Sequence, residues 1–414
     1  MADERIKDSQ INSLIEIEGV IDSDGLSKKI IFSLQTGNEK THTEFMKYVN
    51  ERQLSNFLSS PWKLTLSVNV WMNYNVSGSL CEKQCILLDV LFKNANAIKG
   101  YFQKGSSFQC LSNTRFIQQQ IDIFDNLAKA AFYLTFSSNK SLVFTEWELL
   151  NCMSDVQLEF CLRAGVLTNR YCSSKVDQDA QFSFVHETVQ DFLAAYHIAN
   201  SNQDLIANIK IESIYNVFGM SETIIYLCGL ACKKANQLLN RLVDVKFLND
   251  INRGLSKYVI GAVYNEYDFT QRNVLRSNND QIDDNVRCLT LSVLFQRIII
   301  AGYTEAKASG ENDICLTCTD FICYAHLNES DSNVLKILLL SNKSDVQSLI
   351  LESNVLQTRG ILTVIQQSKH SLTRVKCTAN PEINKALSHT SIEELHFIGH
   401  IDVSSFSCVL PTLS

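Results

Sequence analysis

The sequence predicts a mainly α-helical protein with small β elements, for three reasons. Proline and glycine are scarce, with 3 and 15 copies in 414 residues, whereas average usage is about 5% and 7%. Helix-capping signals stand before apolar residues at helical spacing. A short apolar pattern also recurs three times near the C-terminus. These features disfavour β-sandwiches, propellers and disordered proline-rich chains, which are rich in proline or glycine.

Charge and cysteine content narrow the class of protein further. Lys and Arg number 37 against 44 Asp and Glu, so the formal net charge is −7, and such a field disfavours nucleic acid as a partner. Most of the 14 cysteines lie in apolar runs, as buried free thiols do. The N-terminus lacks the apolar segment of a signal peptide, and no uncharged apolar run is long enough to span a membrane. We therefore expect a cytoplasmic protein without a membrane span.

The first part of the chain, residues 1–59, does not form a complete domain by itself. Residues 11–20 are β-prone and residues 43–58 have helical spacing, which is too little for a layered domain. We expect this segment to complete a domain whose earlier part is not in the chain.

Residues 60–104 are predicted to form a small helical domain. Ser60 followed by Pro61 suits the N-cap and first position of a helix, because the proline ring presets φ and no N–H is lost there. Gly78 allows a turn, and residues 82–101 form a second amphipathic helix.

The segment 105–200 has the order helix, helix, hairpin, helix, which is that of a winged helix. A helix at 116–136 is followed by two capping-box patterns, at 145–148 and 154–157, and Gly165 ends the second capped helix.

The predicted hairpin of this segment consists of the β-prone runs 166–172 and 181–185, and His186 opens the next helix. Many winged helices bind DNA, but residues 145–200 carry eight acidic against three basic residues, which argues against that use.

The remainder of the chain divides into a helical part and a repetitive part. Residues 201–330 are predicted to be helical, most clearly at 214–230, 236–248 and 289–300, with a long loop at 268–285.

Residues 331–414 match the strand consensus of leucine-rich repeats three times. The matches are Val346-x-x-Leu349-x-Leu351-x-x-Asn354, Leu372-x-x-Val375-x-Cys377-x-x-Asn380 and Ile392-x-x-Leu395-x-Phe397-x-x-His400. Their starts are 26 and 20 residues apart, within the range of about 20–29 for this repeat. No terminal capping pattern follows, so we expect the repeats to continue past Ser414.

Motifs for catalysis and metal binding are weak. The nearest match to a P-loop, Gly100-x4-Gly105-Ser106, lacks the lysine that contacts phosphates. The cysteines at 315, 318 and 323 have half of a zinc spacing, which favours core thiols over a four-ligand site. His396 and His400 lie four apart on a predicted strand, too far for one metal. We predict no catalytic residue and no metal site.

His186 has two interpretations on its chemistry alone. A histidine at a helix N-terminus is commonly a capping or core residue. The same position suits an anion such as a phosphate, because the helix end is positive and an imidazole N–H can donate to it.

One motif resembles a known family. Residues 182–196 read Phe-Ser-Phe-Val-His-Glu-Thr-Val-Gln-Asp-Phe-Leu-Ala-Ala-Tyr, which is similar to the winged-helix signature of NACHT-type NOD-like receptors, F-x-F-x-H-x-x-x-Q-[E/D]-F-x-A-A-x-Y. Residues 61–66 with 78–80 resemble the first helical domain of that family, and 224–230 resemble the second. Leucine-rich repeats follow in the same order.

The resemblance implies two nucleotide contacts. Pro61 would lie against the adenine, and His186 would contact the β-phosphate of ADP. In the family, the P-loop, the Mg²⁺-holding acids and the sensor arginine come before the point that matches Met1, so residues 1–59 would be the end of the NACHT module. We expect no cofactor for this chain alone, and ADP or ATP with Mg²⁺ in an intact receptor.

The function implied by the resemblance is the regulatory and sensor portion of an intracellular innate-immune receptor, a signal-transduction switch controlled by ADP and ATP. The chain itself would not be an enzyme. Its partners would be proteins bound by the repeats and helical domains, with homo-oligomerisation of the intact receptor. The alternative is a nucleotide-independent interaction scaffold derived from such a receptor.

Overall fold

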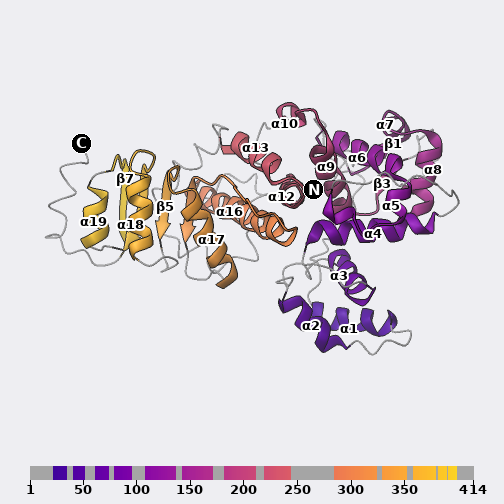
Figure 1. The fold of residues 1–414 in the computed structure, drawn as a ribbon, viewed down its shortest axis with the longest axis horizontal. Helices are drawn as coiled ribbons and strands as arrows, with labels where there is room; N and C mark the ends of the chain where they lie inside the picture. The colour runs from indigo at the N-terminus through magenta and orange to yellow at the C-terminus, as the bar shows by residue number, and fades with distance from the viewer. Residues whose placement is uncertain are drawn as a thin grey trace, which may run out of the picture. The chain divides into compact units, whose positions relative to one another are not determined.

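The computed structural model describes residues 22–34, 41–51, 61–73, 79–95, 108–136, 142–170, 181–210, 219–243, 284–323, 329–351, 358–378, 381–388 and 390–398. These residues are mainly helical and contain two small sheets, as the sequence predicts. The chain divides into two compact units, Met1–Gln203 and Asp204–Ser414, which run from indigo to magenta and from red to yellow in Figure 1. Among the described residues, no helix offers an apolar stretch long enough to cross a bilayer.

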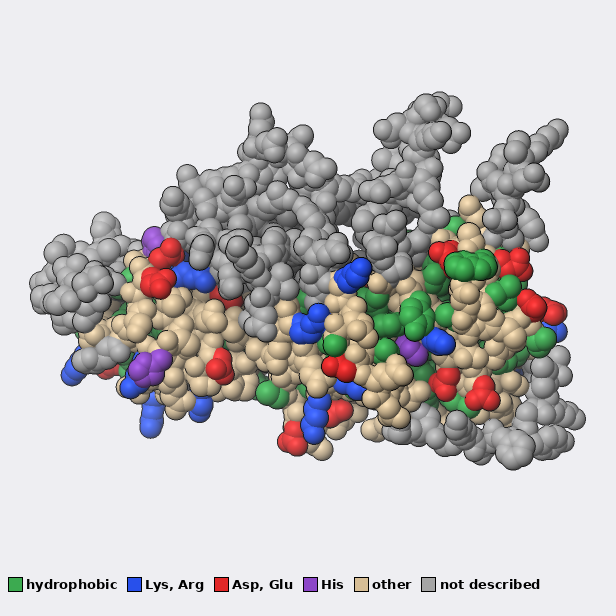
Figure 2. All heavy atoms as spheres, turned by 90° about the horizontal axis from the view of Figure 1, so that it is seen from above, with side chains coloured by type: hydrophobic (Ala, Val, Ile, Leu, Met, Phe, Trp, Pro, Cys, Tyr) green, Lys and Arg blue, Asp and Glu red, His purple; other side chains and the backbone are tan. Residues whose placement is uncertain are grey.

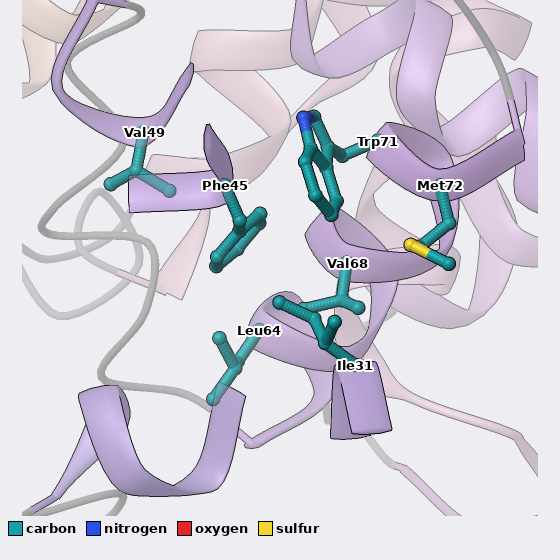
Figure 3. Close-up of a cluster of buried hydrophobic side chains, with 7 residues drawn as sticks. All are labelled: Ile31, Phe45, Val49, Leu64, Val68, Trp71 and Met72. Carbon is teal, nitrogen blue, oxygen red and sulfur yellow. The ribbon is translucent and has the colours of Figure 1, made fainter. Parts of the chain in front are cut away.

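The first unit begins with three helices that share one apolar core. They are α1 (Ser23–Leu34), α2 (His42–Glu51) and α3 (Pro61–Asn73). The buried core residues, drawn in Figure 3, are Ile31, Phe45, Val49, Leu64, Val68, Trp71 and Met72. The rings of Phe45 and Trp71 meet edge to face with centroids 5.4 Å apart. This core joins side chains from both sides of position 59, the predicted boundary between two domains.

An aspartate on the next helix holds a distant part of the chain. Helix α4 (Leu80–Asn94) is capped by Ser79, whose hydroxyl accepts from the N–H of Glu82. Asp89 on α4 accepts backbone N–H bonds from Arg115, Phe116 and Ile117 at 3.2, 2.6 and 2.8 Å. Its carboxylate therefore satisfies the unpaired N–H groups that open the next helix.

The helix expected at 116–136 is interrupted in the structure. Residue Gln120 leaves helical geometry and divides it into α5 (Phe116–Gln119) and α6 (Ile121–Phe136). The two predicted capping boxes are both confirmed, at the starts of α7 (Glu146–Leu150) and α8 (Asp155–Ala164). Gly165 ends α8 with φ of 75°, a conformation that favours glycine.

A three-stranded antiparallel sheet follows these helices. Its order is β1-β3-β2, with β1 at Phe144–Thr145, β2 at Leu167–Arg170 and β3 at Gln181–Phe184. The predicted pairing of the two β-prone runs is confirmed, with Leu167 opposite Phe184. Helix α9 (Glu187–Asn200) begins directly after β3 and packs mainly on α6.

The second unit begins with helices, of which two approach closely at glycines. The first helices described in it are α10 (Leu205–Asn208), α12 (Ser221–Leu230), α13 (Cys232–Val243) and α16 (Asp284–Ala308). A Cβ on Gly302 of α16 would lie 2.7 Å from the sulfur of Cys228 on α12, and a Cβ on Gly229 would lie 2.8 Å from the side chain of Glu305. Helix α16 starts earlier than predicted, and positions 268–283 of the expected loop lie outside the described residues.

A four-stranded parallel sheet contains all three predicted repeat strands. Its order is β4-β5-β6-β7, with strands Asp320–Cys323, Ser348–Leu351, Arg374–Thr378 and Glu394–Ile398. Helices α17 (Glu329–Ser341), α18 (Thr358–Gln367) and α19 (Pro381–Leu387) connect them. Leu349 pairs with Val375, and Val375 pairs with Leu395. The strands therefore lie in the register that the repeat pattern predicts, while its polar ends at 354, 380 and 400 lie outside the described residues.

The first strand of this sheet was not recognised in the sequence. Phe321 pairs with Leu349, so Cys318 and Cys323 stand where Val346 and Leu351 stand in the next unit. Two of the three apolar positions are thus cysteines, against one or none in the three recognised repeats, which makes the match to the consensus weaker.

A glutamine side chain covers the edge of β4. Gln296 of α16 is buried, donates from Nε2 to the carbonyl of Ile322 at 3.0 Å, and accepts at Oε1 from the Ile322 N–H at 2.8 Å. The amide thus substitutes for a neighbouring strand and satisfies backbone groups that an open edge would expose.

We predict that Gln296→Ala lowers the free energy of unfolding of the second unit by about 1–3 kcal/mol, because both backbone groups of Ile322 lose their partner. Gln366→Ala, at an exposed position of α18, is the matched control and should change stability little. Chemical denaturation followed by circular dichroism measures both, and equal effects of the two changes would contradict the role of Gln296.

Asp89 gives a prediction about pH. Burial raises the pKa of Asp89 above its ordinary value, although its three backbone N–H bonds lower it. A carboxyl with a raised folded-state pKa favours folding when protonated, so this contribution is lost as pH rises through that pKa. Asp89→Asn carries no charge at this position. Relative to that variant, the wild type should therefore gain stability as the pH is lowered from about 7 to about 4.5. Denaturation midpoints at the two pH values test this, and a relative loss for the wild type on acidification would refute it.

Candidate functional site

Pro61 is the first residue of α3, as the sequence predicts. Its side chain is exposed, and its carbonyl accepts a hydrogen bond from the Thr65 hydroxyl at 2.8 Å. The preceding Ser60, the expected N-cap, lies outside the described residues. The structure thus places an exposed apolar ring at the beginning of a helix.

His186 is the N-cap of α9, with extended backbone angles. Its Nδ1 accepts from the backbone N–H of Thr188 at 3.2 Å and lies 3.0 Å from the Thr188 hydroxyl. A nitrogen that accepts a hydrogen bond carries no proton, so in the neutral ring the proton is on Nε2. The geometry therefore fixes the tautomer and makes Nε2–H a donor.

The helix that His186 opens is buried nearly all round. Its consecutive buried residues are Thr188, Val189, Gln190, Asp191, Phe192, Leu193, Ala194, Ala195 and Tyr196. Such a helix is held by its neighbours along its length, so its N-terminus has a fixed place in this unit.

Two polar residues of the family-like motif make specific contacts inside the unit. Gln190 donates from Nε2 to the Thr135 hydroxyl at 3.2 Å. Tyr196 donates to Oδ1 of Asp125 at 3.0 Å. Burial, and then the nearby Asp125 carboxylate, raise the pKa of the Tyr196 hydroxyl, which therefore stays protonated as a donor. These motif residues hold α9 against α6.

Pro61 and His186 belong to different groups of elements. Pro61 lies on α3, which packs on α1 and α4, whereas α9 packs on α6, α4 and β3. Helix α4 is the element that both groups share. The two residues are thus connected through α4.

Sequence reasoning missed the partner that orients His186. Thr188 occupies an unspecified position of the motif, two residues after the histidine, and supplies both the N–H and the hydroxyl that meet Nδ1. A hydroxyl residue at the second position of a helix that opens with histidine is the signal that could have indicated this pair.

The cysteines considered for zinc differ in their surroundings. Cys315 is exposed, whereas Cys318 and Cys323 are buried. Burial raises the pKa of Cys318 and raises that of Cys323 to about 12, which opposes the thiolate form that binds metal. Within the described residues, no group of three or more His, Cys, Asp or Glu is arranged to hold a metal ion. His396 lies on β7, while His400, Gly100 and Gly105 lie outside the described residues.

No family model matches the chain, and no curated protein matches its sequence. The residues of the chain itself, above all those at the start of α9, therefore carry the evidence for its function.

We predict that His186→Ala lowers the free energy of unfolding by about 0.5–2 kcal/mol, because the Thr188 N–H loses its acceptor. His186→Asn keeps a side-chain acceptor at the N-cap and should retain most of that stability. Thermal denaturation of the two variants distinguishes capping from packing of the ring. Equal destabilisation by both changes would show that the cap is not what His186 contributes.

Proposed function

We propose that the chain is the regulatory and sensor portion of a receptor similar to the NACHT-type NOD-like receptors, a switch controlled by ADP and ATP. The observation that carries the proposal is the order of the elements. Two capped helices, a small antiparallel sheet and a buried helix opened by His186 are followed by helices and then by parallel strands in repeat register. This is the order that the resemblance implies.

The small sheet and its helices support the assignment of a winged helix. Helix α8 leads through Gly165 into β2, β2 pairs with β3, and α9 follows directly. The strand β1 adds to the free side of β3. The in-register strands β4 to β7, with a helix between each pair, support the assignment of leucine-rich repeats.

The start of α9 suits a phosphate in two ways. The N-terminus of a helix is positive and favours an anion. The tautomer of His186 adds an Nε2–H donor, because Nδ1 is engaged with Thr188. Glu187 in the same turn is exposed and its charge opposes an anion, so the imidazole donor is the more important of the two attractions.

The exposed ring of Pro61 suits the flat face of an adenine, by apolar contact at the start of α3. A nucleotide that touches both residues would link the group α1–α3 to α9. Ligand bound by the repeats would then favour release of this link, provided that it binds the open state more tightly. The nucleotide supplies the negative charge; this chain supplies the donor and the apolar surface.

The second candidate is a nucleotide-independent interaction scaffold. The specific observation in its favour is that capping through Nδ1 explains His186 without any ligand. The two candidates differ in what nucleotide does to the protein, which is measurable.

We predict that this chain alone does not bind ATP tightly, because the sequence contains no Gly-x4-Gly-Lys-[Ser/Thr] pattern to hold the phosphates. Isothermal calorimetry with ATP and Mg²⁺ tests this, and micromolar Mg²⁺-dependent binding would contradict it. If the chain is part of such a receptor, we also expect a Gly-x4-Gly-Lys-[Ser/Thr] pattern in frame about 150 residues before Met1 in the coding sequence.

In a protein that carries the pattern, His186→Asn should weaken ADP retention about tenfold (~1.4 kcal/mol) while the helix cap is kept. His370→Asn, at an exposed turn, is the control. Nucleotide retention that both variants leave unchanged would favour the scaffold.

A further inference from the structure

Four large apolar side chains are exposed within residues 142–156. Leu142 is 45% exposed, Trp147 73%, Leu150 37% and Val156 64%. We name these four residues the apolar patch. On the face seen in Figure 2, hydrophobic side chains gather beside acidic ones toward the right, over the part of the first unit that carries α7 and α8. A tryptophan this exposed is unusual, since burying such a ring is strongly favourable.

The patch is held in place by hydrogen bonds. Its central helix α7 is fixed at its start by the capping box of Thr145 and Glu148. Its end is fixed by bonds from the N–H of Asn151 to Trp147 and from the N–H of Met153 to Leu149. Trp147 and Leu150 are three residues apart on this helix and so share one face. They form a short preformed ridge of the kind that packs into the groove of another helix.

Acidic side chains lie on the same two helices as the patch. Glu146 and Glu148 lie on α7, and Asp155 and Glu159 lie on α8. Among the described residues of α6 and α8, two basic side chains lie nearby. Burial raises the pKa of the Cys152 thiol, and the charge of Lys129 partly offsets that rise. Arg163 lies 3.9 Å from Glu159. The surface is therefore apolar at its centre and negative at its rim.

We propose that the apolar patch binds a basic amphipathic helix of a partner protein. The apolar face of that helix would cover Trp147, Leu150 and Val156, and its lysines or arginines would meet Glu146 and Asp155. Charge complementarity of this kind steers association and excludes partners of the same sign.

The rim charge argues against two other occupants. A second copy of the chain bound through the same patch would bring acidic residues against acidic residues, because a two-fold contact pairs a surface with itself. An anionic membrane surface would repel the rim as well.

The experiment uses the full chain and a fluorescent synthetic helix of leucine and lysine at amphipathic spacing, with binding measured by anisotropy. We expect saturable binding that Trp147→Ala weakens at least about tenfold and that Glu146→Lys with Asp155→Lys also weakens. Phe32→Ala, which removes an aromatic side chain that is 79% exposed on α1, is the matched control and should leave binding unchanged. Thermal melts confirm that each variant folds.

Three results would overturn the proposal. They are no binding of the leucine–lysine helix, equal binding by the wild type and all variants, and equally tight binding of a leucine–glutamate helix. Sedimentation velocity is a further test, because it measures self-association of the chain. Self-association that Trp147→Ala abolishes would identify a second copy as the occupant and would also refute the proposal.

Discussion

The burial of α9 is the constraint on which the first unit depends. Residues 188–196 are buried without interruption, so this helix cannot shift without disturbing α6, α4 and the small sheet. Two of its polar side chains bond to α6 inside the unit: Gln190 donates from Nε2 to Thr135, and Tyr196 donates to Asp125. Both ends of the helix are less enclosed: His186 at the N-terminus is half-buried, and Asn200 at the C-terminus is exposed. A rigid helix with a partly accessible N-terminus can present a donor in a fixed position.

Local features could be predicted from the sequence because they depend on neighbouring residues. The capping boxes at Thr145 and Ser154, the αL residue Gly165 and the strand pair after it all follow from side chains within a few positions of one another. The register of the repeat strands followed as well, since a repeated pattern fixes which residues face one another. The start of α9 at His186 is another local feature that the sequence predicts.

Contacts between distant residues could not be predicted in the same way. Asp89 meets N–H groups 26 to 28 positions later, and Gln296 meets Ile322 across 26 positions. In the sequence, Gln296 is only a polar interruption of an apolar run, and its function becomes clear when the edge of β4 is beside it. Strand β4 itself was missed because two of the three apolar positions of its repeat pattern are cysteines, Cys318 and Cys323. For the site, the histidine was found, but the Thr188 contact that orients it was not.

The two ring nitrogens of His186 have different roles: Nδ1 accepts from the Thr188 N–H and so caps the helix, and Nε2 carries the proton of the neutral ring. Multiple-bond proton–nitrogen correlation spectra of the labelled protein measure this tautomer directly. We expect a neutral ring protonated at Nε2, with the resonance absent in His186→Asn. A ring protonated at Nδ1 would break the bond from the Thr188 N–H and contradict the account.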